Sequence, residues 1–253
     1  MIIMKGSNQY SIQIKGLTVA YQSKKVLHSI YLNIERGHIY GLIGPNGAGK
    51  STLFKCILGE IKPNAGEILI EDRDHVSQLT QIAYVPQKDD IDWDFPARVK
   101  DIVSIGRFSS KKWYQSFSQD DHKKVEESLK KLDITDLAEH HISELSGGQQ
   151  QRMFIARALC QEPEIFLLDE PFVGVDVKTE KIIMDTLKEL AASGKTILVV
   201  HHDLDSVQQY FDKVILINQK LIGYGNTAEV FTRENISVTY KSQTHLIQQY
   251  FGN

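Results

Sequence analysis

The stretch Gly44-Pro45-Asn46-Gly47-Ala48-Gly49-Lys50-Ser51-Thr52 decides the fold of this 253-residue chain. It fits the pattern G-x-x-x-x-G-K-[ST], whose glycines let backbone N–H groups close around phosphate oxygens. An apolar run at 39–43 precedes it and a helix-compatible run at 50–58 follows it, which is the context that this motif requires. The alternative is a glycine-rich turn without a ligand. We expect a phosphate site in which Lys50 reaches the β- and γ-phosphates and Ser51 ligates Mg²⁺.

The composition is that of an ordinary globular chain. The formal net charge is −3 and 24% of the residues are charged, so no basic surface for nucleic acid is indicated. Both cysteines, Cys56 and Cys160, lie in apolar helical stretches, where buried free thiols are expected rather than a disulfide or a metal pair. Residues 1–9 contain no apolar core of signal-peptide length, and no apolar run approaches the ~20 residues of a membrane span. A role at a membrane would therefore depend on a partner.

Hydrophobic periodicity divides the chain into strand-rich and helix-rich parts. Alternation over residues 10–34 predicts an antiparallel ribbon, and the region 88–144 has helical patterns at 99–108 and 120–132. Further strands are predicted at 67–71, 82–85, 165–168, 196–200, 214–217 and 221–224, and a helix at 178–192. The pattern favours an α/β core with a mostly helical insertion.

A second candidate site is the string Leu145-Ser146-Gly147-Gly148-Gln149, which runs into a helical pattern at 150–160. Ser146 can cap that helix, and Gly147 and Gly148 can expose backbone N–H groups at its first turn. The chain thus contains two predicted anion-binding helix starts.

Polar residues follow two of the apolar strands. Asp169 and Glu170 end the run at 165–168, and ligand chemistry in parallel sheets lies at the carboxyl ends of strands. Asp169 is placed to hold Mg²⁺ and Glu170 to orient or deprotonate a water, although an acidic strand end can also serve as a helix cap. The pair His201-His202 follows 196–200, where a histidine could bond the γ-phosphate or the attacking water.

Together these motifs resemble the ATP-binding subunit of an ABC transporter over essentially the whole chain. The resemblance implies an α/β fold, with a RecA-like phosphate-loop core, an antiparallel β subdomain and a helical insertion. It implies a single ATP-binding domain over 1–253. Within it, the core and β subdomain would occupy about 10–87 and 160–225, the helical subdomain about 88–159, and a short tail 226–253.

The resemblance also implies individual roles. Gly44 to Thr52 looks like the Walker A loop, and Asp169 with Glu170 like the Walker B pair, with Glu170 as the catalytic carboxylate. The string from Ser146 to Gln149 is similar to the ATP-binding family signature. Tyr21 looks like the aromatic residue that stacks on adenine, although it could instead be a core tyrosine at the end of a strand. Gln87 looks like the Q-loop glutamine, which contacts Mg²⁺ or water, and Asp176 looks like the D-loop aspartate. His202 looks like the switch histidine, and His201 is an additional histidine beside it. Val173 stands where the D-loop commonly has serine.

The partners follow from the number of sites. Each chain has two predicted anion-binding helix starts but only one Walker loop. Both helix starts would contact ATP if two identical chains pair head to tail, with each ATP between the Walker loop of one chain and the signature of the other. ATP would then favour the closed pair, and hydrolysis would reopen it. The insertion would couple to an integral membrane permease. Trp93, Phe95 and Pro96 are candidates for the docking groove, or else fill the insertion's own core.

A narrower resemblance concerns the cargo. Three segments, Val85-Pro86-Gln87, Ile91 to Pro96 and Ile105-Gly106-Arg107, are similar to the manganese/zinc/iron importer subgroup. Manganese is the first choice of cargo, and zinc or an iron chelate is the second. The resemblance also implies an extracytoplasmic metal-binding protein as an indirect partner, and a location at the cytoplasmic face of the membrane. Two competing functions are a soluble ABC ATPase of DNA repair or translation and a phosphate-loop kinase. The chain lacks the long coiled-coil insertion, tandem cassette or phosphoacceptor domain that these would need.

Overall fold

The computed structural model describes residues 9–22, 24–88, 91–111 and 115–241. They form a mixed α/β fold with an antiparallel sheet, parallel strands and helices. The chain divides into two compact units, unit 1 (1–79 with 191–253) and unit 2 (80–190). Over the described ranges, every helix is too short or too polar to cross a membrane.

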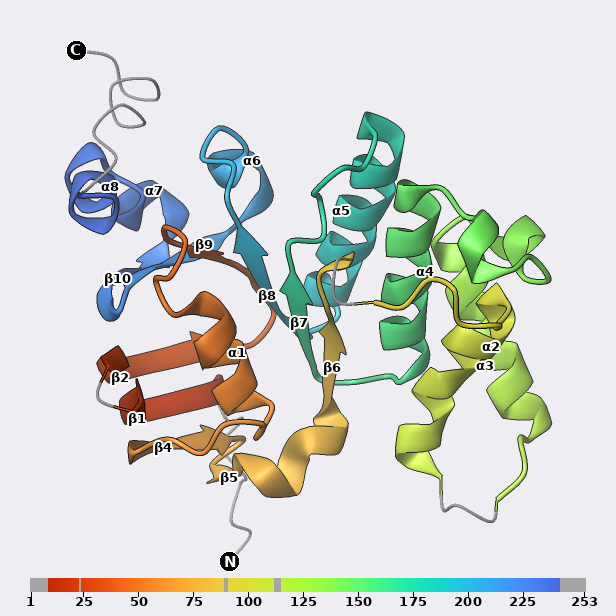
Figure 1. Ribbon diagram of the computed structural model, residues 1–253, viewed down its shortest axis with the longest axis horizontal. Coiled ribbons are helices and arrows are strands. Elements are labelled where there is room, and N and C mark those ends of the chain that lie inside the picture. The colour runs from red at the N-terminus through yellow and green to blue at the C-terminus, as the bar shows by residue number, and fades with distance from the viewer. Residues whose placement is uncertain (1–8, 23, 89–90, 112–114, 242–253) are drawn as a thin grey trace, which may run out of the picture. The chain divides into compact units, whose positions relative to one another are not determined.

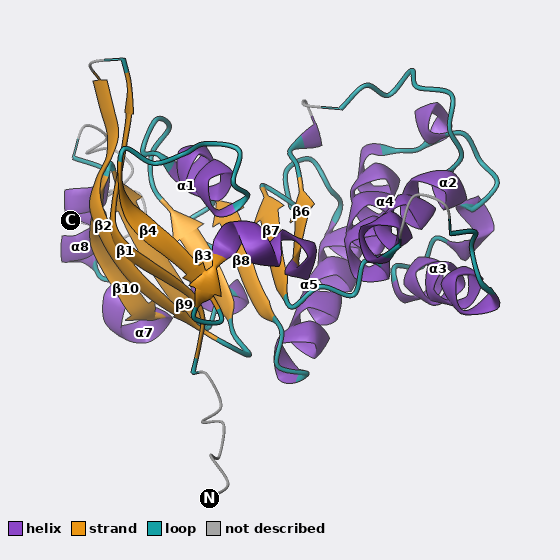
Figure 2. Ribbon diagram, turned by 90° about the horizontal axis from the view of Figure 1, so that it is seen from below, coloured by secondary structure: helices purple, strands orange, loops and turns teal. Residues whose placement is uncertain are grey.

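Unit 1 contains the predicted antiparallel ribbon at 10–34, and two further strands extend it into a sheet of order β2-β1-β4-β5. Figure 2 shows β2, β1 and β4 side by side. Alternate side chains of the first strand are buried, and Ile14 pairs with Leu32 across the ribbon. This confirms the alternation seen at 10–34. The bounds are β1 (Tyr10–Tyr21), β2 (Lys24–Glu35), β4 (Ala65–Ile70) and β5 (Arg73–Asp74).

The second group of strands in unit 1 surrounds β3 (Ile39–Ile43), all of whose residues are buried. It pairs in parallel with β8 (Thr196–His201) and β9 (Lys213–Asn218), and β10 (Lys220–Asn226) adds antiparallel to β9. A strand buried on both faces needs the uninterrupted apolar run that the sequence has. The helices are α1 (Lys50–Ile57), α6 (Val207–Tyr210), α7 (Thr227–Val230) and α8 (Arg233–Thr239). Residues 242–253 of the predicted tail lie outside the described residues.

Unit 2 contains the parallel strands β6 (Ile82–Val85) and β7 (Ile165–Asp169) and the predicted helices. Figure 1 shows α2, α3 and α4 packed against one another. The helices are α2 (Val99–Ser104), α3 (Gln119–Lys131), α4 (Gly147–Cys160) and α5 (Val177–Ala192), and short 3₁₀ segments are η3 (Ile105–Ser110), η4 (Thr135–Leu137) and η5 (Ile142–Glu144). A further 3₁₀ segment, η1 (His75–Gln81), begins in unit 1 and ends in unit 2.

The predicted helix at 99–108 is α-helical only to Ser104 and continues as the 3₁₀ segment η3. At Gly106 this segment comes so close to α4 that a Cβ would lie 2.4 Å from the Arg157 carbonyl oxygen. The next residue, Arg107, is buried and donates to the Cys160 carbonyl at 2.9 Å, to Asp121 at 3.1 Å and to Glu162 at 2.9 Å. Arg107 therefore fastens η3 and α3 to the C-terminal end of α4.

Asp121 makes the folded state sensitive to acid. Hydrogen bonds from Lys111 and Ser118 hold the pKa of Asp121 well below its ordinary value of 3.8. Because the pKa of this carboxyl is lower in the folded chain than in the unfolded chain, its ionisation stabilises the folded chain at pH values above the ordinary pKa. This stabilisation is lost as the pH falls toward and through the pKa of the folded chain. We expect Asp121→Asn to unfold at lower temperature than the wild type near pH 7, with the difference shrinking below about pH 4. Melting curves between pH 3 and 7 measure this, and a constant difference would contradict it.

Candidate functional site

The phosphate loop joins β3 to α1, as predicted, and the structure explains two of its glycines. A Cβ at Gly44 would lie 2.1 Å from the Ile217 carbonyl oxygen of β9, so backbone packing excludes any side chain there. Gly49 has φ +98°, and a Cβ there would lie 2.5 Å from Leu27 Cδ2. At Gly47 the φ is +76° and no atom lies within 4 Å of a Cβ position. The loop is thus packed at its two ends and open in its middle, as a phosphate cradle requires.

Lys50 begins α1 and is almost completely buried. Its Nζ donates to the carbonyl oxygens of Gly44 at 2.7 Å and Pro45 at 3.1 Å. These bonds hold a positive charge against the loop at a helix start, where an anion is favoured. Ser51, in the first turn of the helix, is exposed. An ammonium, backbone N–H groups and a hydroxyl form the donor set that suits a phosphate with a hard cation such as Mg²⁺.

Tyr21 ends β1 and is 49% exposed. The interpretation as a core tyrosine is therefore wrong. An exposed aromatic face is compatible with stacking on a base, and adenine contact stays a prediction.

The acidic pair lies at the carboxyl end of β7, where Asp169 is buried and Glu170 is the first residue beyond the strand. Glu170 has φ +53°, a left-handed conformation that costs a non-glycine residue about 1–3 kcal/mol. Seven other described non-glycine residues outside the predicted site share it, so this backbone alone does not mark a functional residue. Gln87 Nε2 lies 3.4 Å from Glu170 Oε2. The structure thus brings together two residues of the predicted catalytic set, 83 positions apart in the sequence. Periodicity gave no sign of the left-handed backbone.

The signature string begins α4 through a capping box, which confirms the predicted cap. Gln149 N donates to Ser146 Oγ at 3.4 Å, and Ser146 N donates to Gln149 Oε1 at 2.7 Å. Gly147 is exposed, as expected for an open N–H group, whereas Gly148 is buried. A Cβ at Gly148 would lie 2.9 Å from Thr179 Oγ1. Glycine is required there by packing within the chain, a reason that the sequence did not reveal.

Asp176, the predicted D-loop aspartate, is exposed just before α5. Its carboxylate accepts from Thr179 N at 3.0 Å and from Thr179 Oγ1 at 2.7 Å, and these bonds lower the pKa of Asp176. Lys88 Nζ donates to the Val173 carbonyl at 3.3 Å and lies 3.2 Å from a Cβ position on Gly147. Within unit 2, Lys88, the residue after Gln87, is therefore bonded to the D-loop and lies beside the signature turn.

The two histidines at the end of β8 have different surroundings. His201 is buried within the strand, and its Nε2 lies 2.7 Å from Ser206 Oγ. His202 follows the strand and is exposed. The exposed position suits the residue predicted to act on a ligand.

The docking candidates separate into two kinds. Trp93 donates from Nε1 to the Lys88 carbonyl at 3.2 Å, and its ring meets Phe154 of α4 edge-on with centroids 5.6 Å apart. This supports the interpretation in which Trp93 fills the insertion's own core. Phe95 is 56% exposed and Pro96 is exposed, so these two keep the predicted docking role.

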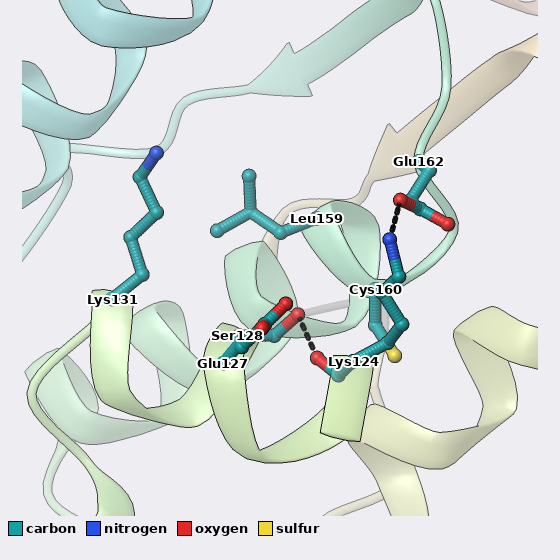
Figure 3. A pocket seen from close by; sticks show the side chains of 7 residues that line it. All are labelled: Lys124, Glu127, Ser128, Lys131, Leu159, Cys160 and Glu162. Carbon is teal, nitrogen blue, oxygen red and sulfur yellow. Dashed lines mark hydrogen bonds and ion pairs between the residues drawn. The ribbon is translucent and has the colours of Figure 1, made fainter. Parts of the chain in front are cut away.

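A pocket of about 180 Å³ lies between α3 and the end of α4 (Figure 3). It lies below the roughly 300 Å³ of typical ligand sites, and its two lysines, Lys124 and Lys131, pair with Glu162 and Glu189. Its lining residues are Lys124, Glu127, Ser128, Lys131, Leu159, Cys160 and Glu162, none of them from the motifs above. Cys160 and Cys56 are buried free thiols, as predicted, and burial raises the pKa of each to about 11.

Comparisons with known proteins find relatives that cover most of the chain. A family model described as ABC transporter matches residues 27–173. The manganese transport system ATP-binding protein MntB of Halalkalibacterium halodurans is 49% identical over 91% of this chain and 92% of its own length. The zinc transport system ATP-binding protein TroB of Treponema pallidum is 43% identical, over 91% and 87%. The solved structure of CbiO1 from Clostridium perfringens, part of the ABC transporter complex CbiONQ, has a TM-score of 0.77 at 31% identity, over 95% of this chain and 99% of CbiO1.

Proposed function

This chain belongs to the ABC transporter ATP-binding proteins, and from that premise we propose that it hydrolyses ATP to power the import of a metal ion, most simply Mn²⁺. The observation that carries the hydrolytic part is the contact between Gln87 and Glu170 at the carboxyl end of β7. The manganese part is supported by MntB at 49% identity. Zinc is the second candidate, because TroB is 43% identical. We treat residues 1–253 as a single ATP-binding domain, with 88–159 as its helical subdomain.

The proposed roles follow from the chemistry of each residue. The N–H groups of the phosphate loop and the Lys50 ammonium would hold the phosphates. Glu170 would orient or deprotonate the attacking water, with Gln87 fixing its carboxylate. His202 would hydrogen-bond the γ-phosphate or that water, and Tyr21 would stack on adenine. Asp176 would support hydrolysis from the D-loop.

Magnesium fits the available oxygen donors. Ser51, Gln87 and Asp169 would hold it through a hydroxyl, an amide oxygen and a carboxylate, which are the ligand types that it prefers. When bound it would neutralise phosphate charge and act as a Lewis acid.

The partners complete the proposal. Two copies of the chain would enclose each ATP between residues 44–52 of one copy and Ser146 to Gln149 of the other, giving a closed two-fold contact. An integral membrane permease would receive the motion through the surface that includes Phe95 and Pro96, and would hold the chain at the cytoplasmic face of the membrane. An extracytoplasmic metal-binding protein would deliver the ion. No nucleic-acid partner is proposed.

The cargo is tested by metal accumulation in cells that lack the gene and in cells complemented with the wild type or with Glu170→Gln. We expect the wild type alone to restore manganese uptake, because uptake would depend on hydrolysis. Measurement of manganese, zinc and iron by mass spectrometry distinguishes the candidates. Restoration of zinc or iron in place of manganese would change the assignment, and restoration by Glu170→Gln would contradict the coupling.

A further inference from the structure

The buried histidine at the end of β8 has no part in the function proposed so far. His201 is 6% exposed, and the exposed His202 follows it directly. In a chain of contacts, His201 Nε2 lies 2.7 Å from Ser206 Oγ, and Ser206 Oγ lies 2.7 Å from Asp203 Oδ2. The chain therefore starts and ends at the two neighbours of His202.

The direction of these hydrogen bonds follows from the number of protons. A serine hydroxyl has one proton to donate, and an ionised carboxylate can only accept. Ser206 therefore donates to Asp203 and accepts from His201, which places a proton on Nε2 of the imidazole. The other carboxylate oxygen, Asp203 Oδ1, accepts from Asp205 N at 3.1 Å. Both ends of the turn at 202–206 are thus fixed by side chains.

The imidazole itself is held by aromatic packing within unit 1. The Phe211 ring meets it edge-on with centroids 5.2 Å apart, and Tyr210 lies at 6.1 Å. Phe211 is buried against β3, where a Cβ at Gly41 would come within 2.6 Å of its ring. Leu204, in the middle of the turn, is also buried. The turn is therefore anchored to β3, the strand that leads into the phosphate loop.

We propose that His201 is a positioning residue for ATP hydrolysis, which through Ser206 and Asp203 fixes the turn that presents His202. This inference rests on the role proposed above for His202. A group held in place by a chain of hydrogen bonds loses little entropy when it meets the transition state, and small misplacements of such groups reduce turnover strongly. Loss of the chain should therefore act on turnover rather than on ATP binding.

The test uses the purified full chain and compares kcat and KM for MgATP. We expect Ser206→Ala and His201→Leu each to lower kcat about tenfold with KM changed less than about twofold, because neither residue would bind the nucleotide itself. His201→Gln should restore most of the loss, since its amide N–H can donate to Ser206 in place of Nε2. The double variant His201→Leu/Ser206→Ala should be no worse than either single one, because both break the same chain. Gln208→Ala, an exposed change in α6, is the control.

The outcomes separate this inference from the proposed function. If His202→Ala is inactive while Ser206→Ala keeps wild-type kcat, the positioning role is wrong and the proposed function stands. If His202→Ala keeps wild-type kcat, the role of His202 fails and the positioning role with it. If His201→Leu does not fold, Ser206→Ala decides the question alone, because it removes one oxygen and leaves the aromatic packing in place. A loss at His201→Gln equal to that at His201→Leu would also overturn the proposal.

Discussion

Glu170→Gln is expected to lower ATP turnover by about 10²–10⁴-fold while changing ATP affinity only slightly, because general base catalysis contributes gains of that size. The amide keeps the shape of the carboxylate and can still meet Gln87, which lies 3.4 Å from the present Oε2. It cannot take a proton from water at neutral pH. The ATP-bound pair of chains should therefore accumulate, since closure would no longer be ended by hydrolysis.

Phosphate release measures the turnover of this variant, and size-exclusion chromatography with ATP measures the paired species. Glu127→Gln, an exposed change on α3, is the matched control and should behave as the wild type. Near-normal hydrolysis by Glu170→Gln would remove Glu170 from the catalytic role. Loss of ATP binding would instead indicate that the change had disturbed the left-handed backbone at this position.

Lys50→Ala is expected to weaken ATP binding by about 10- to 150-fold, because a hydrogen bond to a charged group contributes about 1.5–3 kcal/mol. The Lys50 ammonium is buried and is held by two carbonyl oxygens of the loop that it would serve. No other lysine or arginine lies within residues 38–54, so the loop itself contains no substitute charge. Titration with ATP by calorimetry measures the effect.

Lys55→Ala is the matched control for this change, because Lys55 lies on the same helix and is exposed. It should bind ATP as the wild type does. Equal affinity in Lys50→Ala and the wild type would mean that phosphate is not held at this loop. A loss of thermal stability in Lys50→Ala without ATP would identify a folding defect, and the comparison would then use Lys50→Met, which keeps most of the side-chain volume.

Much of the fold follows from short-range patterns. The run at 39–43 predicted β3 because a strand covered on both faces must be apolar throughout, and the alternation at 10–34 predicted the ribbon because its strands have two different faces. Ser146 predicted the start of α4, since its hydroxyl can satisfy a free N–H group within three residues. Each of these features is decided by neighbours in the sequence.

The other features depend on contacts between distant residues. Gly148 is a glycine because Thr179 occupies the space beside it, and Gly44 because a carbonyl of β9 lies there. Neither contact is visible in a local pattern. The same holds for η3, which departs from α-helical geometry beside α4. The contact of His201 with Ser206 joins residues only five positions apart, but no periodic pattern marks it. The role of Trp93 stayed open until its contact with Phe154 was seen.

The shared ATP site is tested most directly by mixing two inactive variants. Lys50→Ala would disable the phosphate loop, and Ser146→Arg would block the signature turn while leaving monomer ATP binding intact, with Ser146→Ala as the control for loss of the cap alone. Neither variant should hydrolyse ATP by itself. An equal mixture should regain up to about a quarter of wild-type activity, because half of the pairs would be mixed and each mixed pair would contain one intact site. A mixture no more active than its separate components would contradict a site built from two chains.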